Sequence, residues 1–353
     1  MASFEDAIRR RAAAADRSLV FPEGDDPRIC EAAAVLARHH WVRPVLLGHA
    51  PTITQQLTAA GYPSSAVRQW HPEALEGTRP QGEPGTIVIV DPSVPDERCI
   101  AALHEARAHR GLSLDEARAR SLEPLMRGAL MVRLGDVDGS VAGAVHSTGD
   151  VMRAAFWCVG PAPGIRTVSS SFYMVVPEFR DQGDEVLAYT DAAVVPDPDA
   201  EQLADIAVAA ADARRRIVGD EPRVAFLSYS TQASAEGPSI EKVRQAVAQF
   251  RQRRPDVAVD GELQADAALI RAVAQRKAPD SRVAGSANVL VFPDLDAGNI
   301  AYKLTQYLAQ ASAIGPIVQG LDRPCNDLSR GASANDIVEV ACVTALNSMA
   351  DLP

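Results

Sequence analysis

Short apolar runs rich in β-branched residues alternate with longer helical runs along almost the whole chain. The second half shows the rhythm clearly, with a strand predicted at 224–227, a helix at 240–253, a strand at 257–260 and a helix at 263–276. Strands that alternate with helices in this way are typical of mostly parallel sheets covered by helices on both faces. The sequence therefore predicts an α/β fold.

The rest of the chain continues this pattern. An amphipathic helix is predicted within residues 1–18, Asp26 and Pro27 open a second helix, and a capping box of Ser113 and Glu116 opens another. Strands are predicted at 19–21, 44–47, 86–91, 140–145, 168–176, 289–292 and 316–319. Further helices are predicted at 27–39, 113–128, 199–218, 298–310 and from about 333 onward.

Length and composition limit the classes of protein to consider. A length of 353 residues suggests two domains, and the Pro- and Gly-rich stretch 160–164 is the best candidate boundary. The net charge of −11 argues against a general nucleic-acid binder and against a protein held on anionic lipid by charge. The five scattered cysteines exclude a disulfide framework and favour a reducing compartment. With no apolar run of membrane-spanning length and no signal peptide, we expect a cytoplasmic protein.

Several catalytic and binding motifs are absent from the sequence. It contains no G-x-x-x-x-G-K-[ST] loop for nucleotides, no G-x-G-x-x-G fingerprint, no G-x-S-x-G elbow and no H-E-x-x-H metal motif. No histidines pair at metal-ligand spacing, so we predict no metal site, and covalent Ser-His catalysis has little support.

Ligands of open α/β sheets bind at the carboxyl ends of the strands, where helix N-termini offer free N–H groups. This rule selects four segments of the chain: the loops after Phe21, after Val145 and after Leu227, and the polar loop before the last helix. We expect the site to lie among them.

Six segments with specific sequences occur in order along the chain. They are Phe21-Pro22-Glu23-Gly24, Asp136-Val137-Asp138-Gly139 with His146-Ser147-Thr148 and Arg153, Leu227-Ser228-Tyr229-Ser230-Thr231, Asp260-Gly261-Glu262-Leu263-Gln264, Val289-Leu290-Val291-Phe292-Pro293-Asp294-Leu295, and Asn326-Asp327-Leu328-Ser329-Arg330-Gly331. Together they resemble the phosphate acetyltransferase (phosphotransacetylase) family, which is related to the phosphate butyryltransferases. The resemblance runs from about Leu19 to Leu346 and so covers essentially the whole chain.

The resemblance implies a fold like that of isocitrate and isopropylmalate dehydrogenases, with two α/β domains flanking a cleft. Domain I would comprise residues 1–163 with 318–353, and domain II, inserted between them, residues 164–317. It further implies a homodimer formed through domain II. Because the chain begins at the catalytic portion, it is expected to be the short form of the family.

The implied reaction is the reversible transfer of an acetyl group between acetyl phosphate and coenzyme A. In a ternary complex, the coenzyme A thiolate would attack the acetyl carbonyl directly and phosphate would leave. Coenzyme A or acetyl-CoA, acetyl phosphate and inorganic phosphate are then the binding partners, with no further cofactor and no metal. A longer acyl phosphate such as butyryl phosphate, a decarboxylating dehydrogenase on the related fold and a non-catalytic acyl-CoA-sensing module are the alternatives.

The resemblance carries three catalytic roles to this chain. Asp336 matches the base that removes the thiol proton, although Ser333 and Asp336 also read simply as a helix capping box. An ordinary aspartate (pKa about 3.9) is a poor base for a thiol (about 8.5) unless burial raises its pKa or a cation such as Arg330 stabilises the thiolate. Ser329 would orient the thiol, and Arg330 would stabilise charge on the carbonyl oxygen and departing phosphate. A turn serine and an ion pair of Arg330 with Asp327 are the simpler alternatives.

The resemblance also implies three arginines that contact the anionic substrates, for each of which a solvated surface position is the alternative. Arg28 corresponds to an arginine associated with coenzyme A. Arg107 matches a family arginine, although its neighbours depart from the family pattern. Arg153 follows Ser147 and Thr148 into the first turns of a helix, where N–H groups already favour anions. The residues predicted to bind substrate are therefore these three arginines together with Ser147 and Thr148.

Two further hydroxyl residues follow a predicted strand in the second half of the chain. Ser230 and Thr231 are predicted to hold phosphate oxygens, and capping or turn formation is an equally good reading of the same residues.

Overall fold

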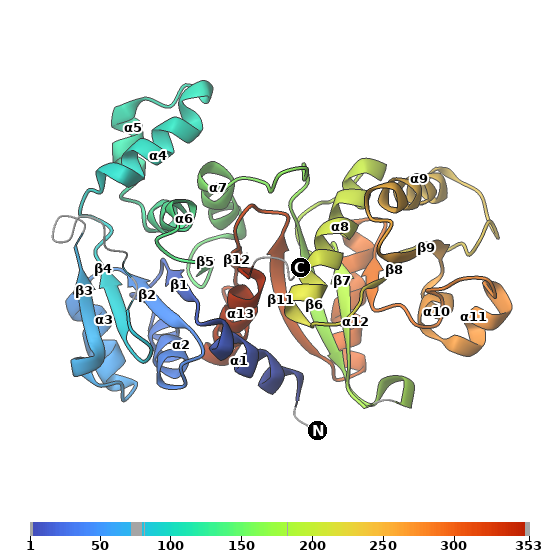
Figure 1. The fold of residues 1–353 in the computed structure, drawn as a ribbon, viewed down its shortest axis with the longest axis horizontal. Coiled ribbons are helices and arrows are strands. Elements are labelled where there is room, and N and C mark those ends of the chain that lie inside the picture. Colours follow the sequence, from blue (N-terminus) through green and yellow to red (C-terminus); the bar gives the residue numbers. More distant parts are fainter. Residues whose placement is uncertain (1–2, 72–79, 81, 182, 350–353) are drawn as a thin grey trace. The chain divides into compact units, whose positions relative to one another are not determined.

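The computed structural model of the chain describes residues 3–71, 80, 82–181 and 183–349. The chain folds into two compact units. Glu5–Ala162 with Leu321–Ala350 form what we call the terminal unit, and Pro163–Gly320 form the inserted unit. Each unit contains one sheet with helices packed against it, so the predicted α/β class is confirmed (Figure 1).

The terminal unit is built on a parallel sheet. Its strands are β1 (Ser18–Phe21), β2 (Arg43–Leu47), β3 (Val67–Trp70), β4 (Ile87–Val90), β5 (Gly139–Ala142) and β12 (Cys325–Asp327). Its helices are α1 (Phe4–Ala15), α2 (Pro27–Arg38), α3 (Ala50–Ala59), α4 (Glu97–Arg107), α5 (Leu114–Arg120), α6 (Pro124–Leu134), α7 (Thr148–Cys158) and α13 (Ala334–Asn347). The strand order is β12-β5-β1-β2-β4-β3, and every neighbouring pair runs parallel.

Helices cover both faces of this sheet (Figure 1). On one face α13 packs against α2 and against β5 and β1. On the other, Met131 and Val132 of α6 pack against Val20 of β1 and Val45 of β2 in one buried apolar cluster. Because both faces are covered, the strands β1, β2 and β4 are mainly apolar runs rather than alternating ones, as expected for a parallel sheet.

The inserted unit contains a mixed sheet. Its strands are β6 (Ser169–Val176), β7 (Glu185–Thr190), β8 (Arg223–Leu227), β9 (Ala258–Leu263), β10 (Val289–Val291) and β11 (Ser312–Gln319). Its helices are α8 (Ala200–Ile217), α9 (Pro238–Arg253), α10 (Ala265–Leu269), α11 (Arg271–Lys277) and α12 (Leu295–Leu308). In the order β11-β6-β7-β10-β8-β9, β6 is antiparallel to both its neighbours and the other pairs are parallel. The short connection from β6 to β7 forces this reversal.

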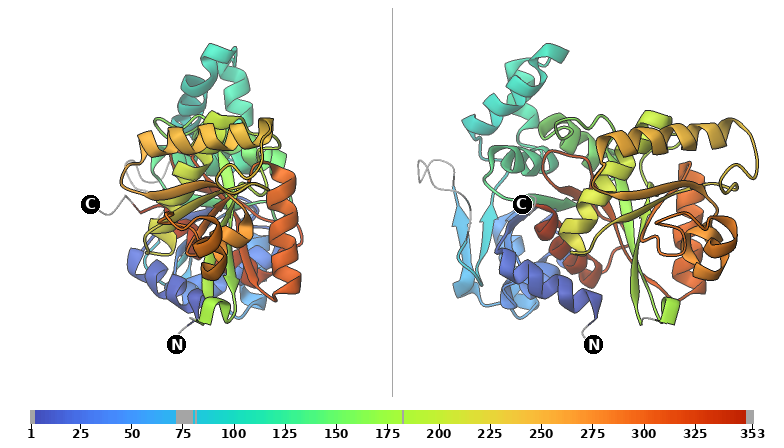
Figure 2. Two further views of the ribbon diagram at one scale, coloured as in Figure 1. Left: turned by 90° about the vertical axis from the view of Figure 1, so that its right-hand side faces the viewer. Right: turned by 45° about the vertical axis from the view of Figure 1, so that its right-hand side comes forward.

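Helices α8 and α12 lie on opposite faces of the mixed sheet (Figure 2). On the α12 face, the ring of Phe172 stacks on Tyr302 with 4.0 Å between centroids. On the α8 face, Gln319 Nε2 donates to the carbonyl oxygen of Ile206 at 3.3 Å. Alternate residues of these strands thus point to opposite faces of the sheet, where they contact α8 or α12.

The predicted elements differ from the observed ones at a few places. The predicted helix 113–128 is two helices, because Pro124 starts α6 and holds the residue before it extended. The predicted helix 263–276 breaks at Ile270, and nothing in the structure explains the break. Strand β5 stops at Ala142 because Gly143 turns the chain with a φ of +109°. Strands β3, β7 and β12 and helices α3 and α4 were not predicted at all.

Two further features concern the cysteines and the apolar character of the helices. All five cysteines are unpaired and buried. No helix within the described residues combines the length and the apolar character that a membrane crossing requires.

Candidate active site

Three polar loops meet at the carboxyl edge of the terminal unit's sheet. They follow the adjacent strands β1, β5 and β12 and lead into the N-termini of α2, α7 and α13. Three of the four segments selected from the sequence are therefore neighbours. The fourth, after β8, lies in the inserted unit.

The carboxylate of Glu23 organises the loop after β5. Its oxygens accept hydrogen bonds from the backbone N–H groups of residues 143–146 at 2.8 to 2.9 Å, and His146 Nδ1 lies 2.8 Å from Oε1. Glu23 is only 6% exposed, so these bonds replace its hydration. Successive N–H groups that converge in this way form an anion-binding nest. Here the protein's own carboxylate occupies it and fixes the loop.

Arg28 joins the three loops. Its Nε and Nη2 hold the carboxylate of Asp26 at 3.0 and 2.8 Å, and Nη2 also donates to the Ala144 oxygen at 2.8 Å. Its Nη1 donates to the backbone oxygens of Arg330 at 2.8 Å and Ala332 at 3.0 Å. A guanidinium has five N–H donors, so all of them are used inside the protein. A coenzyme A phosphate would have to replace one of these acceptors.

Asp336 completes the capping box at the start of α13. Its Oδ2 accepts from the backbone N and from Oγ of Ser333, both at 2.8 Å, and its own N–H donates to Ser333 Oγ at 3.2 Å. The capping box read from the sequence is therefore present. Asp336 is exposed, and its Oδ1 has no partner among the described residues.

Ser329 and Arg330 are exposed on the loop between β12 and α13. Ser329 Oγ accepts the N–H of Gly331 at 3.2 Å, which makes a tight turn. The Arg330 guanidinium has no partner within the part of the chain that the structure describes. It does not pair with Asp327, whose buried carboxylate instead accepts from Thr148 Oγ1 at 2.6 Å. The loop thus presents a free cation.

The N-terminus of α7 carries three predicted substrate contacts. Ser147 is the N-cap and donates from Oγ to Asp150 Oδ2 at 2.7 Å. Arg153 pairs with Asp150 at 2.8 Å and remains 55% exposed. Thr148, the first residue of the helix, is also exposed, and the unpaired N–H groups of the first turn favour an anion there.

Arg107 packs at the end of α4, away from the loop contacts described above. Its guanidinium carbon lies 4.8 Å from the ring centre of Trp157, which also stacks on Arg120 at 5.1 Å. Burial lowers the pKa of Arg107, and the nearby charge of Arg110 lowers it further. No contact in the described residues joins Arg107 to the loops after β1, β5 or β12.

Ser230 and Thr231 lie in the inserted unit, after β8. Ser230 is fully buried and donates from Oγ to Glu262 Oε1 at 2.8 Å. Burial alone would raise the pKa of Glu262, but hydrogen bonds from Arg244, the Ala233 N–H and Ser230 lower it to about 2. Thr231 Oγ1 donates to Gln264 Oε1 at 3.2 Å and accepts the Gln264 N–H at 2.9 Å. Both hydroxyls therefore have internal partners, as the turn-forming alternative predicts.

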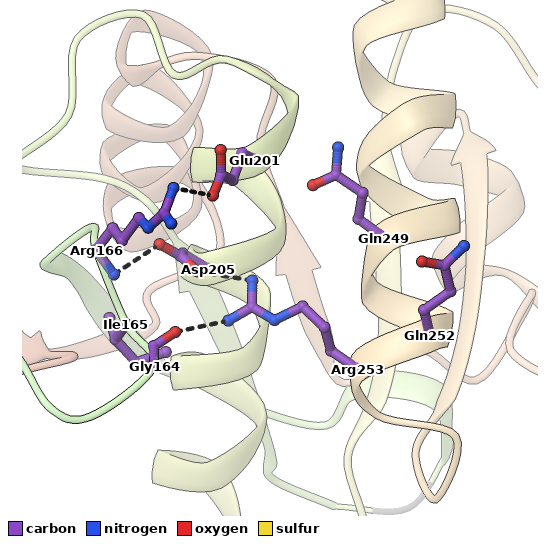
Figure 3. A pocket seen from close by; sticks show the side chains of 8 residues that line it. All are labelled: Gly164, Ile165, Arg166, Glu201, Asp205, Gln249, Gln252 and Arg253. Carbon is purple, nitrogen blue, oxygen red and sulfur yellow. Dashed lines mark hydrogen bonds and ion pairs between the residues drawn. The ribbon is translucent and has the colours of Figure 1, made fainter.

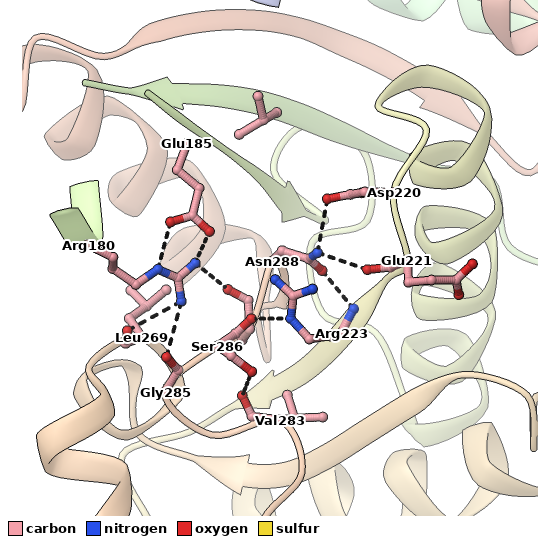
Figure 4. Close-up of polar contacts among 12 residues, drawn as sticks. Arg180, Glu185, Asp220, Glu221, Arg223, Leu269, Val283, Gly285, Ser286 and Asn288 are labelled. Carbon is pink, nitrogen blue, oxygen red and sulfur yellow. Dashed lines mark hydrogen bonds and ion pairs between the residues drawn. The ribbon is translucent and has the colours of Figure 1, made fainter. Parts of the chain in front are cut away.

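Two hollows in the inserted unit are lined by residues other than the predicted site residues. The first, of about 490 Å³, holds Asp205, which accepts from Arg253 Nη1 at 2.7 Å and from the Arg166 N–H at 3.0 Å (Figure 3). In the second, of about 820 Å³, the Arg180 guanidinium binds both oxygens of Glu185 (Figure 4). In neither hollow are these carboxylates available to a ligand. Across the described residues no cluster of His, Cys, Asp and Glu is suited to a metal ion.

Two residues of the site were not predicted to have a role. Glu23 was part of a recognised segment, and Asp327 was considered only as an ion-pair partner of Arg330. Both are acids at or within two residues of the carboxyl end of a strand, which is a signal that sequence reasoning can use. Their partners, residues 143–146 and Thr148, are over 100 positions away and leave no local signal.

Comparison with known proteins identifies the family of the chain. Residues 3–345 match the phosphate acetyl/butaryl transferase family. The chain is 42% identical over 349 residues to a phosphate acetyltransferase of Acetivibrio thermocellus, which covers 98% of each chain. A phosphotransacetylase structure from Streptococcus pyogenes matches with a TM-score of 0.86 at 36% identity, over 99% of both chains. A 4-hydroxythreonine-4-phosphate dehydrogenase from Klebsiella pneumoniae, at 15% identity and a TM-score of 0.56 over 95% of this chain and all of its own, shares the fold. The predicted isocitrate dehydrogenase-like fold is thus confirmed, and the chain belongs to the phosphate acetyl/butaryl transferase family.

Proposed function

We propose that the protein is a phosphate acetyltransferase, which transfers an acetyl group reversibly between acetyl phosphate and coenzyme A. The observation that carries this proposal is the full-length identity of 42% to a phosphate acetyltransferase. The predicted catalytic residues Ser329, Arg330 and Asp336 are all present on one exposed loop and helix start, which supports a catalytic rather than a sensing role.

In the proposed reaction, the coenzyme A thiolate attacks the acetyl carbonyl and the bond from carbonyl carbon to phosphate oxygen breaks. Asp336 accepts the thiol proton through Oδ1, since its Oδ2 is held by the cap of α13. Burial does not assist this base, because Asp336 is exposed. The free cation of Arg330 therefore stabilises the thiolate and the oxygen that gains charge. Ser329 orients the thiol.

The departing phosphate is proposed to lie at the start of α7. Arg153, Ser147 and Thr148 surround free N–H groups there, and each charge-assisted hydrogen bond contributes about 1.5–3 kcal/mol. Ser230 and Thr231, with Arg28 and Arg107, remain proposed contacts with the substrates. Arg28, Ser230 and Thr231 would each exchange one internal partner for a substrate oxygen.

We also propose a homodimer in the cytoplasm. Helix α12 exposes four large apolar side chains at helical spacing, with exposures between 53% and 80%: Ile300, Leu304, Tyr307 and Leu308. A contiguous exposed apolar stripe of this kind is typical of an interface between subunits. The five unpaired cysteines suit a reducing compartment.

The proposed activity is tested by thioester formation from acetyl phosphate and coenzyme A, with purified protein, in a chelator. Propionyl and butyryl phosphate are compared in parallel. Turnover fastest with acetyl phosphate would establish the acetyltransferase, and turnover fastest with a longer acyl phosphate would change the substrate while keeping the mechanism. A folded protein that binds acetyl-CoA but turns over none of the three would overturn the catalytic proposal.

A further inference from the structure

A buried acid lies directly beneath the proposed phosphate site. Asp327 is the last residue of β12, is 3% exposed and comes two positions before Ser329. Its Oδ2 accepts the hydroxyl proton of Thr148 at 2.6 Å, whereas its Oδ1 is buried without any hydrogen-bond partner. Thr148 is exposed, so its hydroxyl connects the surface at the start of α7 with this acid.

The backbone around Asp327 leaves Oδ1 without a donor. The N–H of Gly143 is directed to Glu23, and the N–H of Leu328 donates to the Ala142 oxygen at 2.7 Å. A Cβ atom at Gly143 would lie 2.3 Å from Oδ1, so the chain passes too close for a water to enter between them. Burial, and secondarily the negative charge of Glu23, raises the pKa of Asp327 to about 6, although the hydrogen bond from Thr148 and the nearby N–H of Leu328 both lower it. A proton on the acid would remove the cost of this poorly solvated charge.

The protonation state of Asp327 decides which way the Thr148 hydroxyl points. When the acid is ionised, it has only lone pairs, and Thr148 must donate to it. When the acid carries a proton, its O–H donates to Thr148 Oγ1, and the hydrogen of Thr148 becomes free for another acceptor. That acceptor would be an anion at the start of α7.

We propose that Asp327 is a positioning residue of the phosphate site, which takes up one proton when a dianionic phosphate binds and thereby turns the Thr148 hydroxyl toward that phosphate. The proton comes from solvent, and it returns there when the phosphate leaves. This inference rests on the proposed function for the identity of the phosphate, but its geometry belongs to Asp327 and Thr148 alone.

The other charged groups near β12 do not carry out this exchange. Glu23 faces Asp327 and favours its protonation. The charges on α7, α13 and the loop after β5 already have partners: Asp150 with Arg153, Glu339 with Arg9, Asp336 with Ser333, and His146 with Glu23. Arg330, on the loop after β12, is exposed and its guanidinium has no partner among the described residues. A bound dianion adds a second negative charge above Asp327 and so raises its proton affinity further.

The test measures proton uptake on binding of sulfate, a dianion that does not itself titrate near neutral pH. Calorimetric titration in two buffers of different ionisation enthalpy gives the number of protons bound. We expect uptake approaching one proton at about pH 7, and a sulfate Kd that rises by up to tenfold per pH unit above about 6. Acetyl phosphate should compete with the sulfate, and its KM should rise with pH in the same range.

Three variants separate this role from a structural one. Asp327→Asn mimics the protonated acid, so sulfate binding should persist with no proton uptake and no rise in Kd with pH. Thr148→Val lacks the hydroxyl, so sulfate should bind several-fold more weakly and with a flat pH profile. Thr148→Ser should restore both the affinity and the proton uptake. Glu339→Gln, at a buried acid that faces α1 instead, is the matched control and should leave the linkage unchanged.

The outcomes distinguish this inference from the proposed function. Proton uptake that survives in Asp327→Asn, or sulfate binding by the parent protein without any uptake, would overturn the inference even if acetyl-CoA is formed. Failure of sulfate to bind, or to compete with acetyl phosphate, would also overturn it. Linked uptake lost in Asp327→Asn, in a protein without acetyltransferase activity, would support the proton-coupled anion site and reject only the reaction.

Discussion

Oε1 of Glu23 lies 2.8 Å from both the backbone N and the ring Nδ1 of His146. The two residues come from the loops after β1 and β5, so this contact joins neighbouring strand ends that are far apart in sequence. A carboxylate that faces Nδ1 favours the proton on that nitrogen, which leaves Nε2 as the acceptor of the neutral ring. The orientation of the imidazole at the site is therefore set by Glu23.

Replacing Glu23 by Gln should disorganise the loop of residues 143–146. In the parent protein both carboxylate oxygens of Glu23 accept N–H groups of residues 143–146. In the variant the NH₂ group of glutamine would take the place of one oxygen, so the buried N–H groups that face it would lose their acceptor. We expect the free energy of unfolding to fall by about 3 kcal/mol, with a loss of acetyltransferase activity, measured by urea denaturation and thioester assay. Glu31→Gln, on the exposed side of α2, is the control. An equal free energy of unfolding for Glu23→Gln and Glu31→Gln would show that the conformation of residues 143–146 does not depend on the charge of Glu23.

Replacing Arg28 by Ala should release the three loops from one another. We expect turnover to fall by about 100-fold, because small displacements of positioned groups have effects of that size. Since every donor of Arg28 is used internally, the KM values for coenzyme A and its 3′-dephospho analogue should change by similar factors. A loss confined to coenzyme A would show instead that the guanidinium leaves its backbone acceptors to bind the 3′-phosphate.

Replacing Asp336 by Gln separates the helix cap from the chemistry. Glutamine is also favoured at this position of a capping box, so stability should change by less than about 0.5 kcal/mol. Removal of the base should lower kcat by about 10²–10⁴-fold, with little change in coenzyme A affinity. Glu116→Gln likewise places glutamine at the third position of the α5 capping box and should leave kcat unaltered. Retained turnover in Asp336→Gln would exclude Asp336 as the base.

Replacing Asp327 by Asn should stabilise the protein at neutral pH. The folded protein holds the proton of Asp327 up to about pH 6, against an ordinary value of 3.8, so its stability falls as pH rises between these values. Asparagine cannot ionise, and the variant should therefore gain about 3 kcal/mol relative to the parent above pH 6 and nothing below pH 4. Urea denaturation of both proteins across this range measures the difference. A difference that does not vary with pH would contradict the assignment.

Replacing Leu304 by Asp should dissociate the proposed dimer, because the charge lies at the centre of the apolar stripe on α12. Sedimentation velocity should then show about half the mass of the parent protein at micromolar concentration. Ala248→Glu, at an exposed position on α9, serves as the control for a surface charge. Unchanged mass in both variants would place the subunit contact elsewhere or show that the parent is a monomer.

Much of the fold follows from local sequence rules. The capping boxes of Ser113 and Ser333 were predicted and are present, and Pro27 begins α2 as expected. The breaks were harder to predict: Pro124 starts a new helix, but the periodicity of apolar residues continues across it. The direction of β6 could not be predicted from the local pattern of apolar residues either. Its antiparallel pairing with β7 depends on a short connection in which residues such as Arg180 adopt a left-handed conformation.

The candidate site was predictable in position but not in its internal contacts. The rule on strand ends selected the loops after β1, β5 and β12, and these are neighbours in the sheet. The sequence does not reveal that Arg28 donates to the loops after β5 and β12, nor that Thr148 donates to Asp327. Both depend on which strands are adjacent, and adjacency of β12 with β5 is a long-range property of the chain.

The terminal unit takes its sheet from both sides of the inserted unit, and this has a consequence for synthesis on the ribosome. When Ala162 emerges, β5 lacks its neighbour β12, and the face of the sheet that α13 covers is still exposed. The inserted unit can complete its own sheet before β12 and α13 emerge, since its strands all precede Leu321. The nascent terminal unit therefore exposes an unpaired strand edge and apolar core surface while the whole inserted unit is translated. This is the interval in which a chaperone would protect the chain most from aggregation.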